Sequence, residues 1–521
     1  MSITFIEQND QTIARREHLD ALRRLVGNVY PNKFQRSSIV ETGREDTISG
    51  VVQKFQAFEP KAEPDTRPAA EGIELANQQL NHFAVRLAGR IASPPRVMGK
   101  AAFVHLSDGV SRLQIYLRKA DIVGVSNDAD GGNVDGWELF QLLDHGDFIG
   151  VEGFLFVTKT GELSVHVQKL QFLSKALVPL PDKMHGIHDA EIRQRQRYAD
   201  LIAGSLKLEK DGSLTPREVF DRRATAVKEL RRILEDHGYV EVETPMLTPL
   251  ATGAAARPFK THHNALDIDL YARIAPELYL KRLLVGGFEK VYELNRNFRN
   301  EGVSTKHNPE FTMLEFYWAY ADVNQMMDFC EEMLRAVVFK TLGHTVAQFG
   351  EFEIDFGQPF RRVSMKDSLK GLTDGVEVDN DNVIELFEDR VEHRLIQPTF
   401  ITDFPKPISP LSKASPADPN IAERFELYMA GMEAANGFSE LNDPMEQYER
   451  FRDQMKERER GDDEAMVMDE DYLRALSYGM PPAAGIGIGI DRFVMLLTNK
   501  QSIREVILFP HMRPERKGET E

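Results

Sequence analysis

Apolar and polar residues alternate with different periods in different parts of the chain. In residues 12–27, apolar side chains such as Leu19 and Leu22 recur at helical spacing, which predicts a helix that ends at Gly27. From 82–173 the period changes to two, in short runs separated by Gly, Asp and Ser. About five strands at this spacing predict a small closed β-barrel of the OB type.

A mixed pattern of long helices and strands follows, so the expected fold class is α+β. One helix is predicted over 217–237 and leads into the strand "YVEVETP". The segment before the barrel is polar and holds Pro60, Pro64 and Pro68, which indicates a linker or an inserted loop. The predicted organisation is therefore an N-terminal helical extension, a polar linker or insertion, an OB-fold domain and a large α+β domain, over residues 1–40, 41–76, 77–178 and 179–521 respectively.

Two predicted strands, 291–301 and 311–318, combine an apolar face with an unusual second face. Side chains alternate across a strand, and the even-numbered positions of both segments are largely apolar, whereas the odd-numbered positions include Phe311, Glu315 and Tyr317. An antiparallel sheet with one solvated face is a common alternative. A solvated face rarely carries two aromatic rings beside a carboxylate, however, and the floor of a site for a charged, aromatic ligand needs these residue types. We therefore predict a binding face here.

A pair of carboxylates in "RFELYMAGMEAANGFSELND", residues 424–443, suggests a cation site. Glu426 and Glu433 have opposite parity on a regular strand, so both can face one ligand only if the chain bulges between them. Gly431 is well placed for such a bulge. Two carboxylates near phosphate would hold Mg²⁺, which prefers oxygen ligands.

A third stretch, "GIGIGIDRFVMLLT", alternates glycine with isoleucine. Gly485, Gly487 and Gly489 fall on one face and leave a bare backbone surface against which a flat ligand can lie. Asp491 is then placed to cap a helix, with Arg492 in its first turn, where anions are favoured. A tightly packed buried strand is the alternative. No phosphate-binding P-loop pattern occurs in the sequence.

Composition restricts the classes of function. The 64 basic and 82 acidic residues give a net charge of −18, so any binding of nucleic acid must use a local patch. Residues 82–120 provide one, with seven basic residues against the single acid Asp108, although a solvated strand surface would look similar. Cys330 is the only cysteine, which excludes an internal disulfide and fits a reducing compartment. Without a signal peptide or a long apolar run, we expect a cytoplasmic protein with no membrane partner.

These stretches together resemble the signature of the class II aminoacyl-tRNA synthetases. "GYVEVETPML", with Pro245, resembles the motif that forms the dimer interface in that family; "FRNEG" with "HNPEF", and "GIGIGIDR", resemble the two motifs that bind ATP. Within the class, "ARPFKTHHNALDIDLYARIAPELYLKR", "NGFSELND" and the barrel are similar to the bacterial lysyl-tRNA synthetase family. The resemblance implies an OB-fold barrel followed by a class II catalytic domain, a homodimer, and ATP-dependent ligation of L-lysine to tRNA(Lys), with no DNA partner.

The resemblance also assigns roles to residues. Arg299 would hold the α-phosphate of ATP and Arg492 the γ-phosphate, as the catalytic pair. The implied ATP contacts are Arg299, Glu301, His307, Asn308, Phe311 and Arg492. The implied lysine contacts are Gly253, Glu277, Glu315, Tyr317, Asn436, Phe438 and Glu440. Up to three Mg²⁺ ions per subunit are implied, with Glu426 and Glu433 as ligands, and the implied anticodon contacts in the barrel are Arg96, Phe103 and Gln114.

The acids in this set favour lysine on physical grounds as well. Glu277, Glu315 and Glu440 suit a ligand with two ammonium groups, whereas a pocket for aspartate needs cations. Two departures from the family are expected to matter: Lys306 replaces a common arginine, and residues 361–397 form a shortened helical insertion. The alternatives are a paralogue that transfers lysine to a protein such as elongation factor P, although those relatives lack the barrel, and a catalytically inactive RNA-binding scaffold, which should have lost Arg299, Arg492 or the acids.

Overall fold

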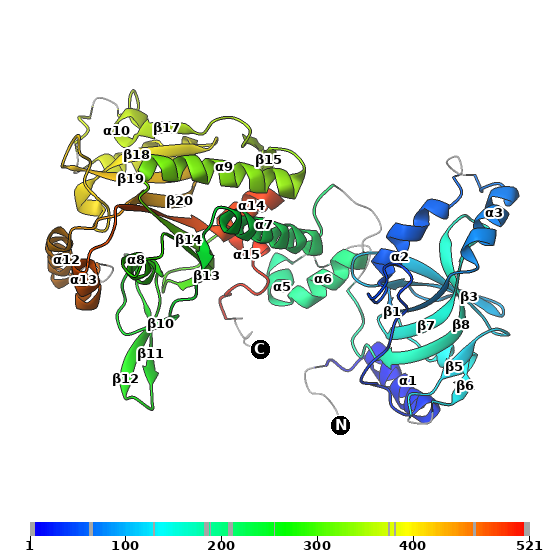
Figure 1. Ribbon diagram of the computed structural model, residues 1–521. Coiled ribbons are helices and arrows are strands. Elements are labelled where there is room, and N and C mark those ends of the chain that lie inside the picture. Colours follow the sequence, from blue (N-terminus) through cyan, green and yellow to red (C-terminus); the bar gives the residue numbers. More distant parts are fainter. Residues whose placement is uncertain are drawn as a thin grey trace. The chain divides into compact units, whose positions relative to one another are not determined.

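The computed structural model describes residues 6–61, 66–128, 131–181, 187, 189–206, 212–254, 256–373, 376–379, 382–461 and 465–514. The chain divides into two compact units, Met1–Arg217 and Glu218–Glu521 (Figure 1). Each unit is described by itself.

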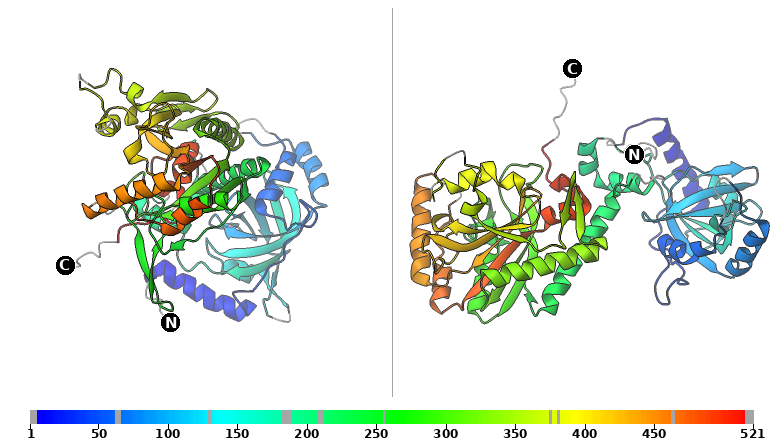
Figure 2. Two further views of the ribbon diagram at one scale, coloured as in Figure 1. Left: turned by 60° about the vertical axis from the view of Figure 1, so that its left-hand side comes forward. Right: turned by 90° about the horizontal axis from the view of Figure 1, so that it is seen from above.

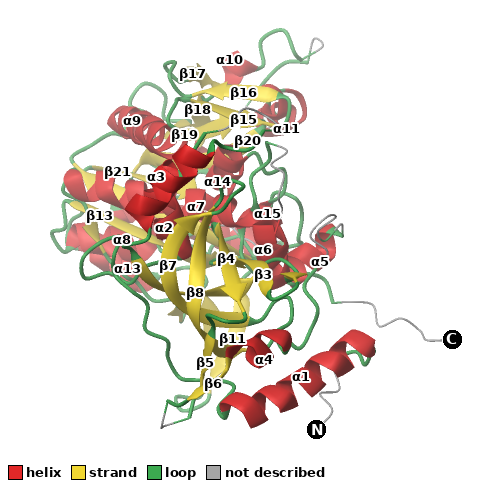
Figure 3. Cartoon of the chain, turned by 90° about the vertical axis from the view of Figure 1, so that its right-hand side faces the viewer, coloured by secondary structure: helices red, strands yellow, loops and turns green. Residues whose placement is uncertain are grey.

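The first unit contains a closed barrel of five strands. β1 pairs with β3 and β7, β4 pairs with β3 and runs parallel to β8, and β7 pairs with β8, which completes the circle. The buried and less buried positions alternate along these strands, as the period of two predicts. Figure 3 shows β4, β7 and β8 side by side in the wall. The prediction of an OB-type barrel is confirmed; its strands are β1 (Ala84–Ile91), β3 (Ala101–Ser107), β4 (Arg112–Arg118), β7 (Phe148–Val157) and β8 (Leu163–Ser174).

Short elements surround the barrel. The small strands are β2 (Arg96–Met98), β5 (Val123–Val125) and β6 (Asn133–Asp135), and the helices of this unit are α1 (Asp10–Val26), α2 (Ile48–Phe55), α3 (Ala70–Leu80), α4 (Gly136–Gln141), α5 (Ala190–Arg195) and α6 (Arg197–Leu206).

The described part of 41–76 is not an extended linker. Thr47 caps α2, and Ile48, Val51 and Phe55 are buried in the same core as the barrel strands. Three apolar residues at helical spacing were enough to attach this segment, although its average composition is polar. Pro60 and Pro68, which suggested a linker, lie between α2 and α3, and Pro64 lies outside the described residues.

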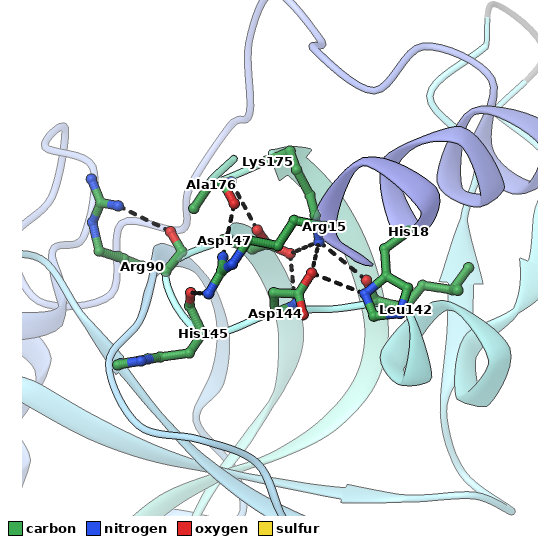
Figure 4. A network of polar contacts seen from close by, with 10 residues as sticks. Arg15, His18, Arg90, Leu142, Asp144, His145, Asp147, Lys175 and Ala176 are labelled. Atoms are coloured by element: carbon green, nitrogen blue, oxygen red, sulfur yellow. Dashed lines mark hydrogen bonds and ion pairs between the residues drawn. The ribbon is translucent and has the colours of Figure 1, made fainter. Parts of the chain in front are cut away.

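A buried polar network joins α1 to the barrel (Figure 4). Arg15 donates hydrogen bonds to the carbonyl oxygens of Ala176 and His145, at 2.8 and 3.0 Å. The ammonium of Lys175 lies 2.7 Å from Oδ2 of Asp147 and 2.5 Å from Oδ2 of Asp144, and the side chains of Lys175 and Asp147 are both 0% exposed. Because every charge here is either ion-paired or hydrogen-bonded, the network tolerates its burial.

We predict that Lys175→Met destabilises the first unit by about 3–5 kcal/mol, since Asp147 would stay buried without its cation. For a unit of this size, that corresponds to a fall in Tm of about 10 °C by differential scanning calorimetry. The matched control is Lys169→Met, because Lys169 pairs with Glu152 on the surface, where such a pair contributes under about 1 kcal/mol. Equal losses in both variants would contradict the prediction.

The second unit is built on one large sheet, which in the described residues has eight strands. Its order is β17-β18-β19-β20-β21-β14-β13-β9, antiparallel except for the outer pairs β17–β18 and β9–β13. The bounds are β9 (Val240–Glu241), β13 (Lys290–Phe298), β14 (Glu310–Ala319), β17 (Arg361–Ser364), β18 (Thr399–Pro405), β19 (Ile421–Met429), β20 (Met432–Ser439) and β21 (Ala483–Gly489). The predicted α+β fold is therefore confirmed.

The two faces of this sheet have different neighbours. Leu314 and Phe316 of β14 face the side covered by α9 (Val323–Leu342), where Phe316 contacts Phe329 edge to face. Tyr317, of opposite parity, belongs to the core that α8 (Glu277–Val285) shares on the other side. Parity along the strands thus sorted the residues as predicted, and the charged face is the one beside α8.

The remaining elements border this sheet. Figure 2 shows α12 (Pro444–Glu459) and α13 (Glu470–Ser477), in orange, packed together at one edge. The other helices are α7 (Pro216–Asp236), α10 (Met365–Ser368), α11 (Val383–Arg390), α14 (Ile490–Thr498) and α15 (Ile503–Val506), and the small strands are β10 (Leu247–Thr248), β11 (Phe259–His263), β12 (Ile268–Ala272), β15 (Val346–Phe349) and β16 (Phe352–Asp355). Within 361–397, α10 and α11 share a small core; the shortening of this region relative to the family stays a prediction. Among the described helices, none has the length and apolar character needed to cross a bilayer.

Candidate active site

The glycine-rich strand forms the floor of a deep pocket. β21 lies between β14 and β20, so that Gly485 is paired with Tyr317 on one side and Phe438 on the other. A Cβ at Gly485 would lie 2.3 Å from Oε1 of Glu440 and 2.4 Å from Cε1 of Tyr317. Only a bare backbone therefore lets these side chains lie across the strand.

All predicted lysine contacts border this pocket, which has a volume of about 940 Å³. They come from four separate places: the loop at Gly253, the start of α8, β14, and the end of β20. The lining includes Gly253, Glu277, Glu315, Tyr317, Asn436, Phe438 and Glu440, and also Arg299, Glu426 and Glu433. Gly253 has a φ of 98°, a conformation that favours glycine.

The inner end of the pocket is strongly acidic. Burial raises the pKa of Glu315 to about 8, and the charge of Glu277 adds to the shift. Burial also raises the pKa of Glu440, against the opposing effect of Lys281. The hydroxyl of Tyr317 donates to Oε2 of Glu315 at 3.2 Å. Burying ionised carboxylates costs free energy, and a bound cation would offset this cost. The cluster of acids therefore indicates a binding site for a cation.

Lys281 is a member of the site that the sequence analysis missed. Its ammonium lies 2.7 Å from Oε1 of Glu277 and 2.5 Å from Oε2 of Glu440, and 5.2 Å from the centre of the Phe438 ring. The spacing of four residues between Glu277 and Lys281 on a helix could have revealed the first contact. Nothing local could have revealed the contact with Glu440.

A second, smaller pocket of about 130 Å³ gathers the predicted nucleotide contacts. Its lining includes Arg299, Glu301, His307, Asn308, Phe311 and Arg492. The guanidinium of Arg299 lies 5.2 Å from the centre of the Phe311 ring, and its Nε is buried without an acceptor among the described residues. A buried N–H group of an arginine that has no acceptor fits a binding site for an anion such as phosphate.

Arg492 is held in place by its neighbours. It donates to the carbonyl oxygen of Glu433 at 2.7 Å, and its Nη2 lies 3.0 Å from Nε2 of His307. Because arginine can only donate, Nε2 of His307 must accept, and Nδ1 carries the proton toward Ser304 at 2.9 Å. Burial and then the charge of Arg492 lower the pKa of His307, which keeps the ring neutral.

Asp491 does not cap α14 as the sequence suggested. The cap position is Gly489, and Asp491 lies in the first turn, where Oδ2 accepts from the backbone N–H of Thr312 at 2.7 Å and Oδ1 from Arg223 at 2.6 Å. The carboxylate thus fastens α14 to β14. Tertiary partners outcompeted the local capping bond.

Glu426 and Glu433 do face the same pocket, but no bulge between them is needed. Glu433 is paired with Tyr428 across the hairpin, and Glu426 lies two residues from Tyr428 on the same strand face. The register between β19 and β20 shifts so that Ala434 is the extra residue. Gly431 instead forms the two-residue hairpin turn with Ala430, both with positive φ. Glu426 is buried, and its two oxygens lie 2.5 Å from Arg424 and 2.6 Å from the hydroxyl of Tyr428.

The predicted anticodon contacts lie together on the outer surface of the barrel. Arg96 is paired with Phe103 across β2 and β3, and the Phe103 ring lies 4.9 Å from that of Tyr116. Gln114 donates to Oε2 of Glu162 at 2.6 Å. Aromatic residues that the sequence analysis did not single out extend this surface, namely Tyr116, Phe154, Phe156 and His166. Their parity with Gln114 in β4 and along β7 was the available signal.

Pro245 lies in an exposed loop after β9. Large apolar side chains around it are exposed in the single chain, including Val240 (47%), Leu247 (49%) and Leu250 (38%). Behind them, Arg273 and Glu293 form a fully buried ion pair with a separation of 2.6 Å. An exposed apolar surface above a rigid, ion-paired interior is typical of a protein–protein interface.

An antiparallel sheet with this pocket, joined to an OB-fold barrel, defines a class of enzyme, and sequence comparison agrees. The family described as tRNA synthetases class II (D, K and N) matches residues 189–513, and the OB-fold nucleic acid binding domain matches residues 85–173. The chain therefore belongs to the class II tRNA synthetases.

Individual curated proteins give a more specific comparison than the family match. The chain is 47% identical to the lysine–tRNA ligase of Pelotomaculum thermopropionicum over 519 residues, which cover 92% of this chain and 99% of the relative. It is 46% identical to the lysine–tRNA ligase of Coxiella burnetii, covering 98% of each chain. The corresponding protein of Photorhabdus laumondii is 45% identical over 98% of this chain and 97% of its own length.

Proposed function

We propose that the protein activates L-lysine with ATP and transfers it to tRNA(Lys). The observation that carries this proposal is the inner pocket, in which Glu277, Glu315 and Glu440 surround a space large enough for an amino acid. Three acids against one buried ammonium leave an excess of negative charge that a ligand with two ammonium groups neutralises. The names of the relatives support the same substrate.

The proposed lysine contacts are those that the family resemblance implies. Glu277 and the backbone of Gly253 receive the α-amino group, while Glu315 and Glu440 pair with the ε-ammonium. Tyr317, Asn436 and Phe438 complete the walls of the pocket. A ligand without the ε-ammonium leaves buried carboxylates unpaired, which rejects neutral amino acids. A ligand one methylene shorter is rejected by only about 1–3 kcal/mol, so ornithine is the harder competitor.

Activation requires alignment more than acid–base catalysis. An oxygen of the lysine carboxylate attacks the α-phosphorus of ATP, and the bond to the β-phosphate breaks, so that pyrophosphate leaves and lysyl-adenylate remains. Arg299 neutralises the α-phosphate, Arg492 binds the γ-phosphate, and Phe311 stacks on adenine. Glu301, His307 and Asn308 make the further nucleotide contacts. A hydroxyl of the terminal ribose of tRNA then attacks the acyl carbon, and AMP leaves.

Glu426 and Glu433 would hold Mg²⁺. Both are carboxylates on one wall of the pocket, and the charge of Glu433 is among the causes that raise the pKa of Glu426, after burial. Such mutual repulsion fits a site for a hard divalent cation. When bound, the ion would neutralise phosphate charge as pyrophosphate leaves. Arg424 and Tyr428 keep the Glu426 carboxylate oriented.

The barrel would supply the specificity for tRNA(Lys). Phe103 and its aromatic neighbours offer rings on which unstacked bases can lie, and Gln114 can read a base edge.

A second copy of the chain would cover the exposed apolar surface at Pro245. We therefore propose that the protein is a homodimer, and that it is cytoplasmic.

The proposal is tested in two steps with the whole protein. Lysine-dependent exchange of labelled pyrophosphate into ATP measures activation, and charging of tRNA(Lys) measures transfer. Exchange without charging would favour a paralogue with another acceptor. Loss of both reactions would favour an inactive scaffold.

Lysine activation should depend on pH through the acids of the pocket. Because Glu315 must be ionised to pair with an ammonium and burial raises its pKa to about 8, we predict that kcat/KM for lysine falls as the pH decreases below about 8. Pyrophosphate exchange at saturating ATP measures this limb. The profile for ATP at saturating lysine should lack it, since bound lysine keeps the acid ionised. A flat lysine profile between about pH 6 and 8 would contradict the assignment.

The barrel surface should affect transfer alone. We predict that Gln114→Ala raises KM for tRNA(Lys) about tenfold, because it removes a base-edge contact and frees Glu162, while pyrophosphate exchange stays unchanged. Initial rates of charging at varied tRNA concentration measure the change. The control is Gln171→Ala on the same barrel, where the amide bonds to Asn127. The assignment is wrong if both variants charge tRNA alike.

A further inference from the structure

Lys281 is a buried cation inside a site that must attract cations. Its side chain is 0% exposed, and its ammonium bridges Glu277 on its own helix and Glu440, which follows β20. Burial by itself would lower the pKa of this ammonium, but the charges of Glu277 and Glu440 outweigh burial and raise it. Lys281 is therefore a permanent positive charge at the inner end of the pocket.

The two carboxylates that Lys281 holds are the ones assigned to opposite ends of the substrate. Glu277 is assigned to the α-amino group and Glu440 to the ε-ammonium. Because one ammonium contacts both at 2.7 and 2.5 Å, the two contacting oxygens cannot lie further apart than the sum of these distances. The position of each carboxylate thus depends on the other through Lys281.

The carboxylate of Glu440 keeps capacity for a ligand beyond its ion pair with Lys281. Oε2 forms an ion pair with Lys281, and both oxygens are buried with no hydrogen-bond donor among the described residues. Oε1 is also the atom that lies over the bare backbone of Gly485. An unpartnered, fully buried carboxylate oxygen at a pocket wall is costly unless a ligand donates to it.

Charge explains why the chain places a lysine here. When all three are ionised, Glu277, Glu315 and Glu440 carry three negative charges, and Lys281 reduces the sum to two. A substrate with two ammonium groups then balances the inner pocket. We propose that Lys281 is a positioning residue that fixes Glu277 and Glu440 in their ionised, substrate-ready arrangement and matches the charge of the pocket to a diammonium ligand. This inference rests on the proposed activation of lysine.

The groups that face this cluster come from several elements. They are Glu277 on α8, Glu315 and Tyr317 on β14, Tyr472 on α13, Arg282 on α8, and Arg273 and Glu293 behind β14. Lys281 is the cation that contacts Glu440 directly, so its loss leaves burial to favour the protonated carboxyl. The pKa of Glu440, which burial raises to about 8 even with Lys281 present, would rise further, so that less of the carboxyl would be ionised at neutral pH to attract the ε-ammonium.

The test is Lys281→Met, which keeps the shape of the stem and removes the charge. The expected result is that kcat/KM for lysine in pyrophosphate exchange falls about 100-fold at pH 7, the scale of one uncompensated charge in a buried pair, while KM for ATP changes less than about twofold. The acid limb of the lysine profile should move to higher pH by about one unit or more, so that activity recovers partly in alkaline buffer. Lys281→Arg should keep the wild-type limb with a higher KM.

Lys175→Met is the matched control, because Lys175 is also fully buried between two acids but lies in the barrel unit. It should lower Tm without changing the lysine profile. An unchanged limb in Lys281→Met, or tighter lysine binding at all pH values, would overturn the proposal. If Lys281→Met does not fold, Lys281→Gln carries the same test. Measuring the wild-type protein in parallel distinguishes a failure of the role proposed for Lys281 from a failure of the proposed function. If the wild-type protein shows no lysine-dependent exchange, the proposed function is wrong.

Discussion

Glu440→Gln should lower kcat/KM for lysine by about 100-fold or more in pyrophosphate exchange. The side chain is 1% exposed, and its carboxylate is the one that contacts Lys281 and leaves an oxygen for the ε-ammonium. A neutral amide of the same size removes one charge from a buried ion pair, which costs about 3–5 kcal/mol. Steady-state exchange at varied lysine gives the loss, and KM for ATP should stay near that of the wild type.

Glu449→Gln is the control for this variant, because Glu449 lies on α12 and is exposed. The Glu440 variant should also discriminate less well between lysine and norleucine, which has the same chain without the ammonium. Wild-type use of lysine by Glu440→Gln would show that the ε-ammonium binds elsewhere.

We expect Gly485→Ala to abolish lysine activation almost completely. The new methyl carbon would lie 2.3 Å from Oε1 of Glu440 and 2.4 Å from Tyr317, distances that real Cβ atoms do not adopt. Neither neighbour can move freely, since both side chains are buried. The pocket can accept the methyl only by displacing the groups that bind lysine, and a displacement of about 1 Å in an active site costs about 100-fold in rate.

The same strand provides a graded control. A Cβ at Gly487 would meet the flexible end of Met313 at 3.1 Å, and one at Gly489 would meet nothing closer than 3.7 Å. The losses in kcat/KM for lysine should therefore decrease from Gly485→Ala through Gly487→Ala to Gly489→Ala. Thermal unfolding checks that all three variants fold. Equal losses along the series would mean that the glycines matter for the backbone and not for the space above it.

The strand pairs show which features of the sheet the local sequence pattern could predict. The parity of β14 and β21 predicted which residues face the ligand, because a strand has a fixed period of two and an apolar face must be buried. The same reasoning predicted a bulge at Gly431 between Glu426 and Glu433, which is wrong: a two-residue hairpin turn brings both to one face, and the bulge of this pair lies after them, at Ala434. Gly431 was needed for the hairpin turn, and local sequence does not state which of two uses a glycine serves.

Two other predictions from local sequence were overridden by tertiary contacts. The sequence of 41–76 suggested a linker, yet Ile48, Val51 and Phe55 bury one face of α2 against the barrel. Likewise Asp491 has the residue type of a helix cap but serves as a tie between α14, β14 and α7. In both cases a few contacts with distant segments outweighed a local preference.

By itself, the sequence determined the OB-type barrel and the α+β fold class, the faces of the central strands, the family and a set of site residues that the fold brings into two pockets. These follow from short-range periodicity and from motifs that lie within single segments. The tertiary structure alone decided that Lys281 lies between Glu277 and Glu440, that Gly485 carries no side chain because two others cross it, and that Gln114 faces Glu162. Each of these depends on which strands and helices become neighbours in space, and the energy of a buried charge depends on all its neighbours rather than on its position along the chain.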